Sequence, residues 1–97
     1  MEAKNEFNKA LKYLDFGRTE KGEDCLKNAI QLAESENDLV TLIKAFCCYG
    51  DLLCLMGKKA EAKSYLEHVA SYKSDNDILD YEISRAKELL INIENHK

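Results

Sequence analysis

Proline is absent from this 97-residue chain, and glycine occurs only four times. A β-sandwich or a loop-rich enzyme of this length needs more of these turn-forming residues. Hydrophobic residues nevertheless make up 45% of the sequence, enough apolar surface to offset the entropy of ordering a chain. The composition therefore predicts an all-α fold, formed as a single domain over residues 1–97.

Long apolar runs and basic runs are also missing. No segment reaches the roughly 20 apolar residues that a bilayer-spanning helix needs, and the N-terminal sequence is polar rather than signal-like. We therefore expect a cytoplasmic protein with no membrane partner. The net charge is −4, and the longest purely basic run is Lys58-Lys59. Because nucleic-acid binders normally have a basic face, we expect no nucleic-acid partner.

Motifs that indicate catalysis or metal binding do not occur. The sequence lacks a glycine-rich phosphate loop, a G-x-S-x-G nucleophile turn and any Cys-x-x-Cys pair. Cys47 and Cys54 are seven residues apart, about 10 Å along a helix axis, which is too far for a disulfide. We predict no enzymatic activity, no metal and no cofactor. The cysteines are expected to pack as small hydrophobic residues in a reducing compartment.

Apolar residues at three- and four-residue spacing predict five helices. Their expected ranges are 3–16, 19–35, 38–56, 59–72 and 77–94. Gly17 and Gly57 are expected to end the first and third helices in a left-handed conformation. The helix over 38–56 is apolar nearly all round, so we expect neighbours to cover it on several sides.

Polar residues between these stretches predict the helix starts. Thr19 is the expected N-cap of the second helix, and Asn37 or Asp38 the expected N-cap of the third. Ser74 followed by Asp77 resembles a capping box ahead of the last helix.

The two glycine-closed hairpins repeat at an offset of 40 residues. Gly17 then aligns with Gly57 and Gly22 with Ala62, and the large residue that follows is Leu26 or Leu66. A small residue lets the second helix of a hairpin approach the first, and the larger residue fills the space beside it.

The second hairpin resembles a tetratricopeptide repeat (TPR) unit from Phe46 to Val69. The matching positions are Phe46 for the bulky residue, Tyr49-Gly50 for the Leu-Gly pair, Leu53 for the first aromatic, Gly57 for the turn and Ala62 for the small contact. The resemblance implies a TPR-like right-handed stack of two helical hairpins with a C-terminal capping helix. Its parts would be unit one over 3–36, unit two over 38–73 and the cap over 77–94.

The resemblance also implies a protein–protein interaction module, acting as a scaffold, an adaptor or a chaperone-like protein. In TPR arrays the first helix of each unit lines a concave groove that binds a partner peptide or helix. The corresponding groove residues are Lys4, Phe7, Leu11, Leu14, Lys44, Cys47, Asp51, Cys54 and Leu55. Lys44 matches one lysine of the family's carboxylate clamp, but Cys47 and Asp51 replace the next polar positions. The groove therefore favours an apolar helix or extended segment.

Other interpretations remain open at this point. The closing helix, or a second copy of the chain, can cover the groove residues. The protein can then be a self-associating structural protein, for which a homodimer is the simplest form. It can also be a regulatory protein that senses a peptide, or an oxidant through Cys47 and Cys54.

Overall fold

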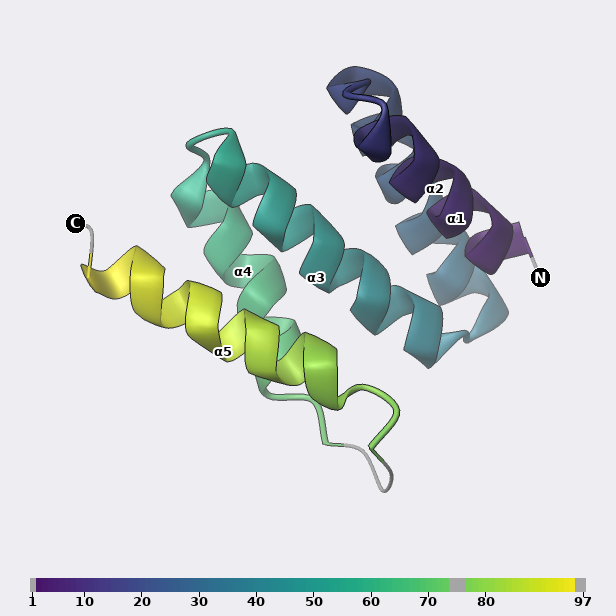
Figure 1. Ribbon diagram of the computed structural model, residues 1–97. Coiled ribbons are helices and arrows are strands. Elements are labelled where there is room, and N and C mark those ends of the chain that lie inside the picture. The colour runs from purple at the N-terminus through teal and green to yellow at the C-terminus, as the bar shows by residue number, and fades with distance from the viewer. Residues whose placement is uncertain (1, 74–76, 96–97) are drawn as a thin grey trace. The chain divides into compact units, whose positions relative to one another are not determined.

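Five α-helices make up the regular structure of the described part of the chain (Figure 1). The computed structural model describes residues 2–73 and 77–95. The helices are α1 (Glu2–Asp15), α2 (Thr19–Glu36), α3 (Leu39–Leu55), α4 (Lys59–Ala70) and α5 (Asp80–Asn95). No strand occurs within those ranges, which confirms the all-α prediction. The predicted start of the last helix, at residue 77, was three residues too early.

The chain forms two compact units, Met1–Ala45 and Phe46–Lys97, and the boundary between them falls inside α3. We describe each unit by itself. Unit 1 contains α1, α2 and the start of α3, and unit 2 contains the rest of α3 with α4 and α5. None of the helices within the described residues is long and apolar enough to cross a membrane.

In unit 1, α1 and α2 pack side by side as an antiparallel hairpin (Figure 1). The contact works through small residues, since Ala3, Ala10 and Ala29 are fully buried, as is Leu26. Small side chains let two helix backbones come close, and the leucine fills the space beside them. The Ala3 N–H also donates to Glu36 Oε1 at 3.4 Å, which ties the start of α1 to the end of α2.

The α1–α2 turn is closed by backbone hydrogen bonds around Gly17. Gly17 has a φ of +74°, a conformation that side chains with a Cβ rarely adopt. Its N–H donates to the Leu14 carbonyl at 3.0 Å, and the Arg18 N–H donates to the Tyr13 carbonyl at 2.8 Å. This pair of bonds is a Schellman motif, and it confirms that Gly17 ends the first helix.

The α3–α4 turn in unit 2 has the same bonds 40 residues later. Gly57 has a φ of +78°. Its N–H donates to the Cys54 carbonyl at 3.1 Å, and the Lys58 N–H donates to the Leu53 carbonyl at 2.8 Å. Each of these four residue numbers is 40 higher than its counterpart in unit 1. The sequence repeat is therefore matched in backbone conformation at both turns.

One predicted helix cap was wrong and another is confirmed. Thr19 is the first residue of α2 and Arg18 is the N-cap, because the Schellman turn ends at residue 18 and the helix follows at once. No described side chain caps this end. At α3, Asp38 Oδ1 accepts the Thr41 N–H at 3.1 Å, as expected of an N-cap. The predicted Ser74 cap lies outside the described residues.

Unit 2 buries a core between α3, α4 and α5. Leu53, Leu66, Val69, Leu79 and Ala86 are at most 1% exposed. Three aromatic contacts join α3 to α4, with ring centroids 5.1 to 5.7 Å apart. They pair Phe46 with Tyr65, Phe46 with His68, and Tyr49 with Tyr65. Rings at these distances, tilted to each other, stabilise the packing beyond the area they bury.

The expected all-round cover of the third helix holds for its middle but is wrong at its ends. Ile43, Ala45, Tyr49 and other central residues of α3 are buried. Leu39, by contrast, is 54% exposed and Leu55 is 82% exposed. These two leucines are the first and last residues of α3, so the burial of the helix ends before its termini.

Candidate interaction surfaces

The predicted groove residues on α1 share one face of that helix but differ in accessibility. Lys4 and Leu11 are exposed, and Phe7 is half-buried. Leu14 packs on the backbone of α2, where a Cβ built at Gly22 would lie 2.6 Å from Leu14 Cδ2. Leu14 therefore belongs mainly to the hairpin contact, and the other three residues are available to a ligand.

The predicted groove residues on α3 fall into two groups. Lys44, in the part of α3 that belongs to unit 1, and Cys54, in unit 2, are half-buried, while Leu55 is largely exposed. Cys47 is 5% exposed and donates its thiol hydrogen to the Glu82 carbonyl of α5, with Sγ 3.7 Å from the oxygen. Helix α5 therefore covers Cys47 within unit 2.

Asp51 is also engaged by α5. Arg85 Nη2 lies 3.4 Å from Asp51 Oδ1, and Arg85 Nη1 lies 2.8 Å from Glu88 Oε1. The Arg85 and Asp51 side chains are each about one-third exposed, so the pair contributes at most about 1 kcal/mol. The consequence concerns binding more than stability, because a peptide that used Asp51 would have to compete with Arg85.

The cysteines are poor candidates for nucleophiles. Burial raises the pKa of Cys47 to about 12 and that of Cys48 to about 11, and the nearby Asp51 carboxylate adds to both. Burial also raises the pKa of Cys25, with a further contribution from Glu6, and it raises the pKa of Cys54. Because the thiolate is the reactive form, all four thiols are held in their unreactive state at neutral pH.

Metal binding finds no support in residues 2–73 and 77–95. No group of three histidine, cysteine, aspartate or glutamate side chains there lies close enough to hold an ion. His68, the one histidine within these ranges, stacks on Phe46 and is exposed.

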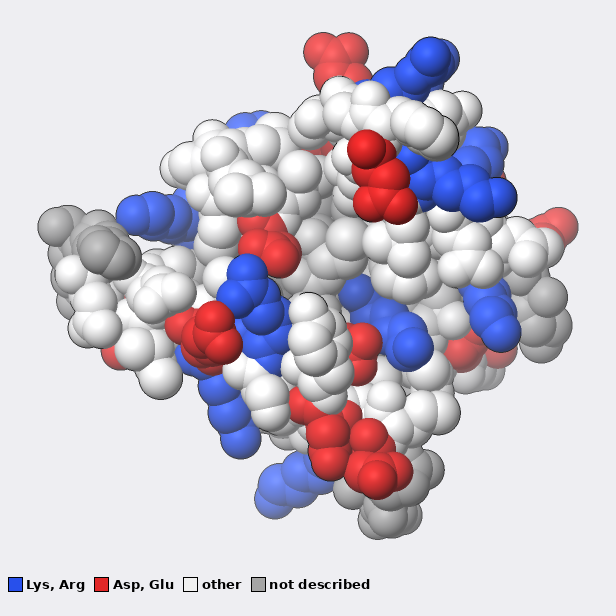
Figure 2. All heavy atoms as spheres, viewed as in Figure 1, with Lys and Arg blue, Asp and Glu red and all other residues white. Residues whose placement is uncertain are grey.

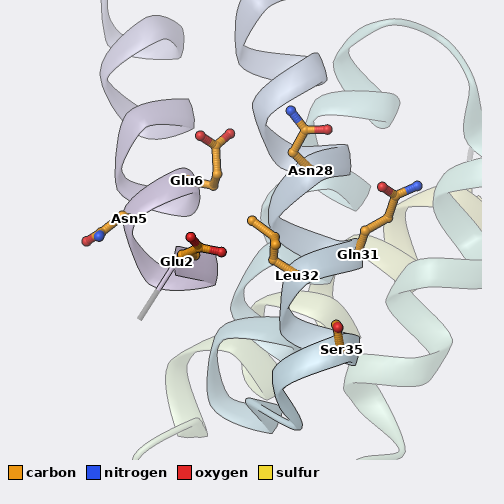
Figure 3. Close-up of a pocket in the computed structure, with 7 residues that line it drawn as sticks. All are labelled: Glu2, Asn5, Glu6, Asn28, Gln31, Leu32 and Ser35. Carbon is orange, nitrogen blue, oxygen red and sulfur yellow. The ribbon is translucent and has the colours of Figure 1, made fainter.

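An acidic hollow of about 610 Å³ lies in unit 1 between α1 and α2 (Figure 3). Its lining residues are Glu2, Asn5, Glu6, Asn28, Gln31, Leu32 and Ser35. In Figure 3, Glu2 and Glu6 lie on the side of α1 that faces α2, and Asn5 turns away. Glu6 Oε1 lies 3.4 Å from Lys9 Nζ, so one of the two carboxylates already has a cationic neighbour.

A second hollow in unit 1 has the opposite character. It measures about 600 Å³ and is lined by Lys9, Lys12, Tyr13, Phe16 and Arg18, and we call it the basic–aromatic hollow. Phe16 is 79% exposed, an unusual state for a phenylalanine. Next to the hollow, Lys21 Nζ lies 5.7 Å from the centre of the Tyr13 ring, within range of a cation–π interaction.

The sequence carries a signal of this second hollow, although no motif marks it. Residues 9, 12, 13 and 16 follow the spacing of one helix face. A search for adjacent basic residues cannot find them, since cations on one helix face are three or four positions apart. Figure 2 shows one face of the surface, where basic and acidic side chains are interspersed and form no large field of one sign.

Comparison with known proteins gives no further guidance: no protein family matches the sequence, and neither does any curated protein or solved structure.

Proposed function

We propose that this protein is a protein–protein interaction module, formed by two TPR-like hairpins in a right-handed stack with α5 as the cap. The main support is the pair of Schellman turns, whose residues and hydrogen bonds repeat at an offset of 40. In each hairpin a glycine also lets a leucine of the other helix reach the backbone, Gly22 with Leu14 and Gly50 with Leu66. Repeated hairpins of this kind are typical of binding scaffolds.

The partner-binding residues in this proposal lie on the first helix of each hairpin. On α1 they are Lys4, Phe7 and Leu11, and on α3 they are Lys44 and Leu55, the more accessible members of the predicted set. The exposed Leu11 and Leu55 suit an apolar helix or extended segment, and Lys4 and Lys44 favour one that also bears a carboxylate. The role would be that of a cytoplasmic scaffold, adaptor or chaperone-like protein.

The raised thiol pKa values support a binding role over the oxidant-sensing alternative. A sensor cysteine is normally exposed and has a lowered pKa. Cys47 has neither property, since it is nearly fully buried and its pKa is raised.

The test is partner capture by a tagged chain, quantified by mass spectrometry. Lys44→Glu combined with Leu55→Asp should abolish capture of the specific partners and leave the helical circular dichroism spectrum unchanged. Lys63→Glu combined with Tyr81→Asp is the matched control, because both residues are exposed and belong to α4 and α5 rather than to the first helix of a hairpin. A folded Lys44/Leu55 variant that captured the same partners as the unaltered chain would show that the surface is assigned wrongly.

Self-association is the second candidate function, and exposed apolar side chains favour it. The exposed large hydrophobic residues are Leu11, Phe16, Leu39, Leu55, Met56, Ile78, Tyr81 and Ile91. Large apolar residues at a surface commonly mark contacts with other chains. Sedimentation velocity over a wide concentration range separates the two functions, since an interaction module for other proteins should remain monomeric throughout.

A further inference from the structure

We propose that the basic–aromatic hollow is a second binding site, which takes an acidic segment of a partner protein with a bulky apolar side chain among its carboxylates. This site is separate from the partner-binding residues proposed above, and it does not depend on the TPR-like assignment. All the residues that line it belong to α1 and to the turn that follows, within unit 1.

The hollow lies on a different side of α1 from the proposed partner-binding residues. Helix residues advance by about 100° each, so Lys4, Phe7 and Leu11 cluster around one direction. By the same arithmetic, Lys9, Lys12 and Phe16 cluster roughly 140° away. A ligand on one face of α1 therefore leaves the other face free, and the two sites can be tested separately.

Charge is the first argument for an acidic ligand. Lys9 lies 3.4 Å from Glu6, which partly satisfies it. Lys12 and Arg18 form no ion pair with any described residue, including Asp15 and Glu20, the acidic residues nearest to them in the sequence. Two unpaired cations at a concave surface of a chain with net charge −4 attract carboxylates and orient them as they approach.

The aromatic residues argue for an apolar side chain within that acidic segment. Phe16 directly follows α1 and leaves most of its ring in water, and Tyr13, which lines the same hollow, is half-buried. A bulky apolar group placed against Phe16 would remove its own apolar surface and the exposed face of the Phe16 ring from water. A small anion cannot do this. A volume of about 600 Å³ is within the usual range for ligand pockets, so a short segment fits and a folded domain does not.

The experiment is a titration of the isotope-labelled full chain, followed by NMR. The probe is a capped hexapeptide of five acidic residues around one phenylalanine. Two comparison peptides replace either the phenylalanine by alanine or the acids by glutamine. The expected result is saturable shifts of Lys9, Lys12, Tyr13, Phe16 and Arg18, with affinity reduced about tenfold or more for either comparison peptide.

Variants connect the binding to these side chains. Lys12→Gln combined with Arg18→Gln, and separately Phe16→Ala, should each weaken probe binding about tenfold. The matched controls are Lys63→Gln with Lys87→Gln, which changes the net charge equally, and Tyr81→Ala, which removes another exposed ring. Both should bind the probe like the unaltered chain. All altered side chains are exposed, and circular dichroism checks that each variant folds.

Several results would overturn the proposal. No saturable shift up to about 1 mM probe, or equal binding of the alanine peptide, would exclude the acidic–apolar ligand. Full competition by inorganic phosphate would indicate a simple anion site. Tighter binding of a short oligothymidine than of the peptide probe would indicate a nucleic-acid site. Concentration-dependent shifts without peptide would indicate a second copy as the occupant. The Lys44→Glu/Leu55→Asp variant should retain probe binding. Loss of the first proposed surface can therefore be told apart from loss of the basic–aromatic site.

Discussion

Leu66 of α4 packs directly on the backbone of Gly50 in α3, and a Cβ built on Gly50 would lie 2.6 Å from Leu66 Cδ2. In unit 1 the helices exchange roles, because Leu14 of the first helix packs on Gly22 of the second, also at 2.6 Å. The two leucines differ in their surroundings, since Leu66 is fully buried and Leu14 is half-buried. The two glycines therefore differ in their expected tolerance to an added methyl group, although the contact distances are equal.

Gly50→Ala should destabilise the protein by about 1–2 kcal/mol. Overpacking a well-filled core costs about 1–3 kcal/mol, and replacing a helical glycine by alanine returns up to about 1 kcal/mol. Gly22→Ala should change the free energy of unfolding by less than about 0.5 kcal/mol, because Leu14 can rotate toward solvent. Chemical denaturation of both variants measures the difference, and equal costs would contradict it.

Gly17→Ala and Gly57→Ala should each lower the free energy of unfolding by about 1–2 kcal/mol, and by similar amounts. Both glycines have a positive φ, which costs a residue with a Cβ about that much. Open space surrounds both positions, so backbone strain rather than a clash sets the cost. Asparagine tolerates this conformation better, and Gly→Asn variants at both sites serve as controls with smaller losses. Clearly different costs at the two sites would mean that the turns are not equivalent.

Asp38→Ala should cost about 0.5–2 kcal/mol at neutral pH, the usual range for an N-cap. Hydrogen bonds from the Thr41 side chain and from the Thr41 N–H lower the pKa of Asp38 below its ordinary value of 3.8. A lowered folded-state pKa means that the stabilisation is complete well above pH 3.8 and is lost as the pH falls through the folded-state pKa. The difference in stability between the unaltered chain and the Asp38→Ala variant should therefore become smaller at acidic pH. Thermal unfolding at pH 7 and pH 3 would show this, and a constant gap would disprove it.

Cys47 should react with a thiol reagent far more slowly in the folded chain than after denaturation. A pKa of about 12, against an ordinary value of 9.0, lowers the thiolate fraction at pH 8 about a thousandfold. Burial at 5% exposure slows access further. Mass spectrometry of the labelled peptides would follow each cysteine separately. Rapid labelling of Cys47 without denaturant would revive the oxidant-sensing interpretation.

Much of the fold could be predicted because local signals determine it. Gly17 and Gly57 each follow an apolar stripe, and a glycine there is the usual end of a helix. The prediction of Thr19 as an N-cap was wrong because the turn after α1 ends at Arg18, which is itself the N-cap. Nothing in the sequence shows that the turn ends at this residue. Exposure at Leu55 was also unpredictable, since an apolar stripe does not tell how far the neighbouring helices extend.

The surfaces were harder to predict than the helices. The contacts of α5 with Cys47 and Asp51 join residues more than 30 positions apart, and nothing local specifies such pairs. The helix spacing of Lys9, Lys12 and Phe16 was visible, but their exposure depends on which side of α1 the hairpin covers. That side is fixed by Ala3 and Ala10, which a search for charged or aromatic motifs passes over.

The boundary between the two units falls between Ala45 and Phe46, in the middle of α3. A fragment cut there would expose four carbonyls at the new helix end of the first piece and four N–H groups at the start of the second. Short helices in water are marginal without their full length and packing. Dissecting this protein into halves would therefore destroy an element that both need, and peptide-level hydrogen exchange on the intact chain is the better way to ask which half opens first.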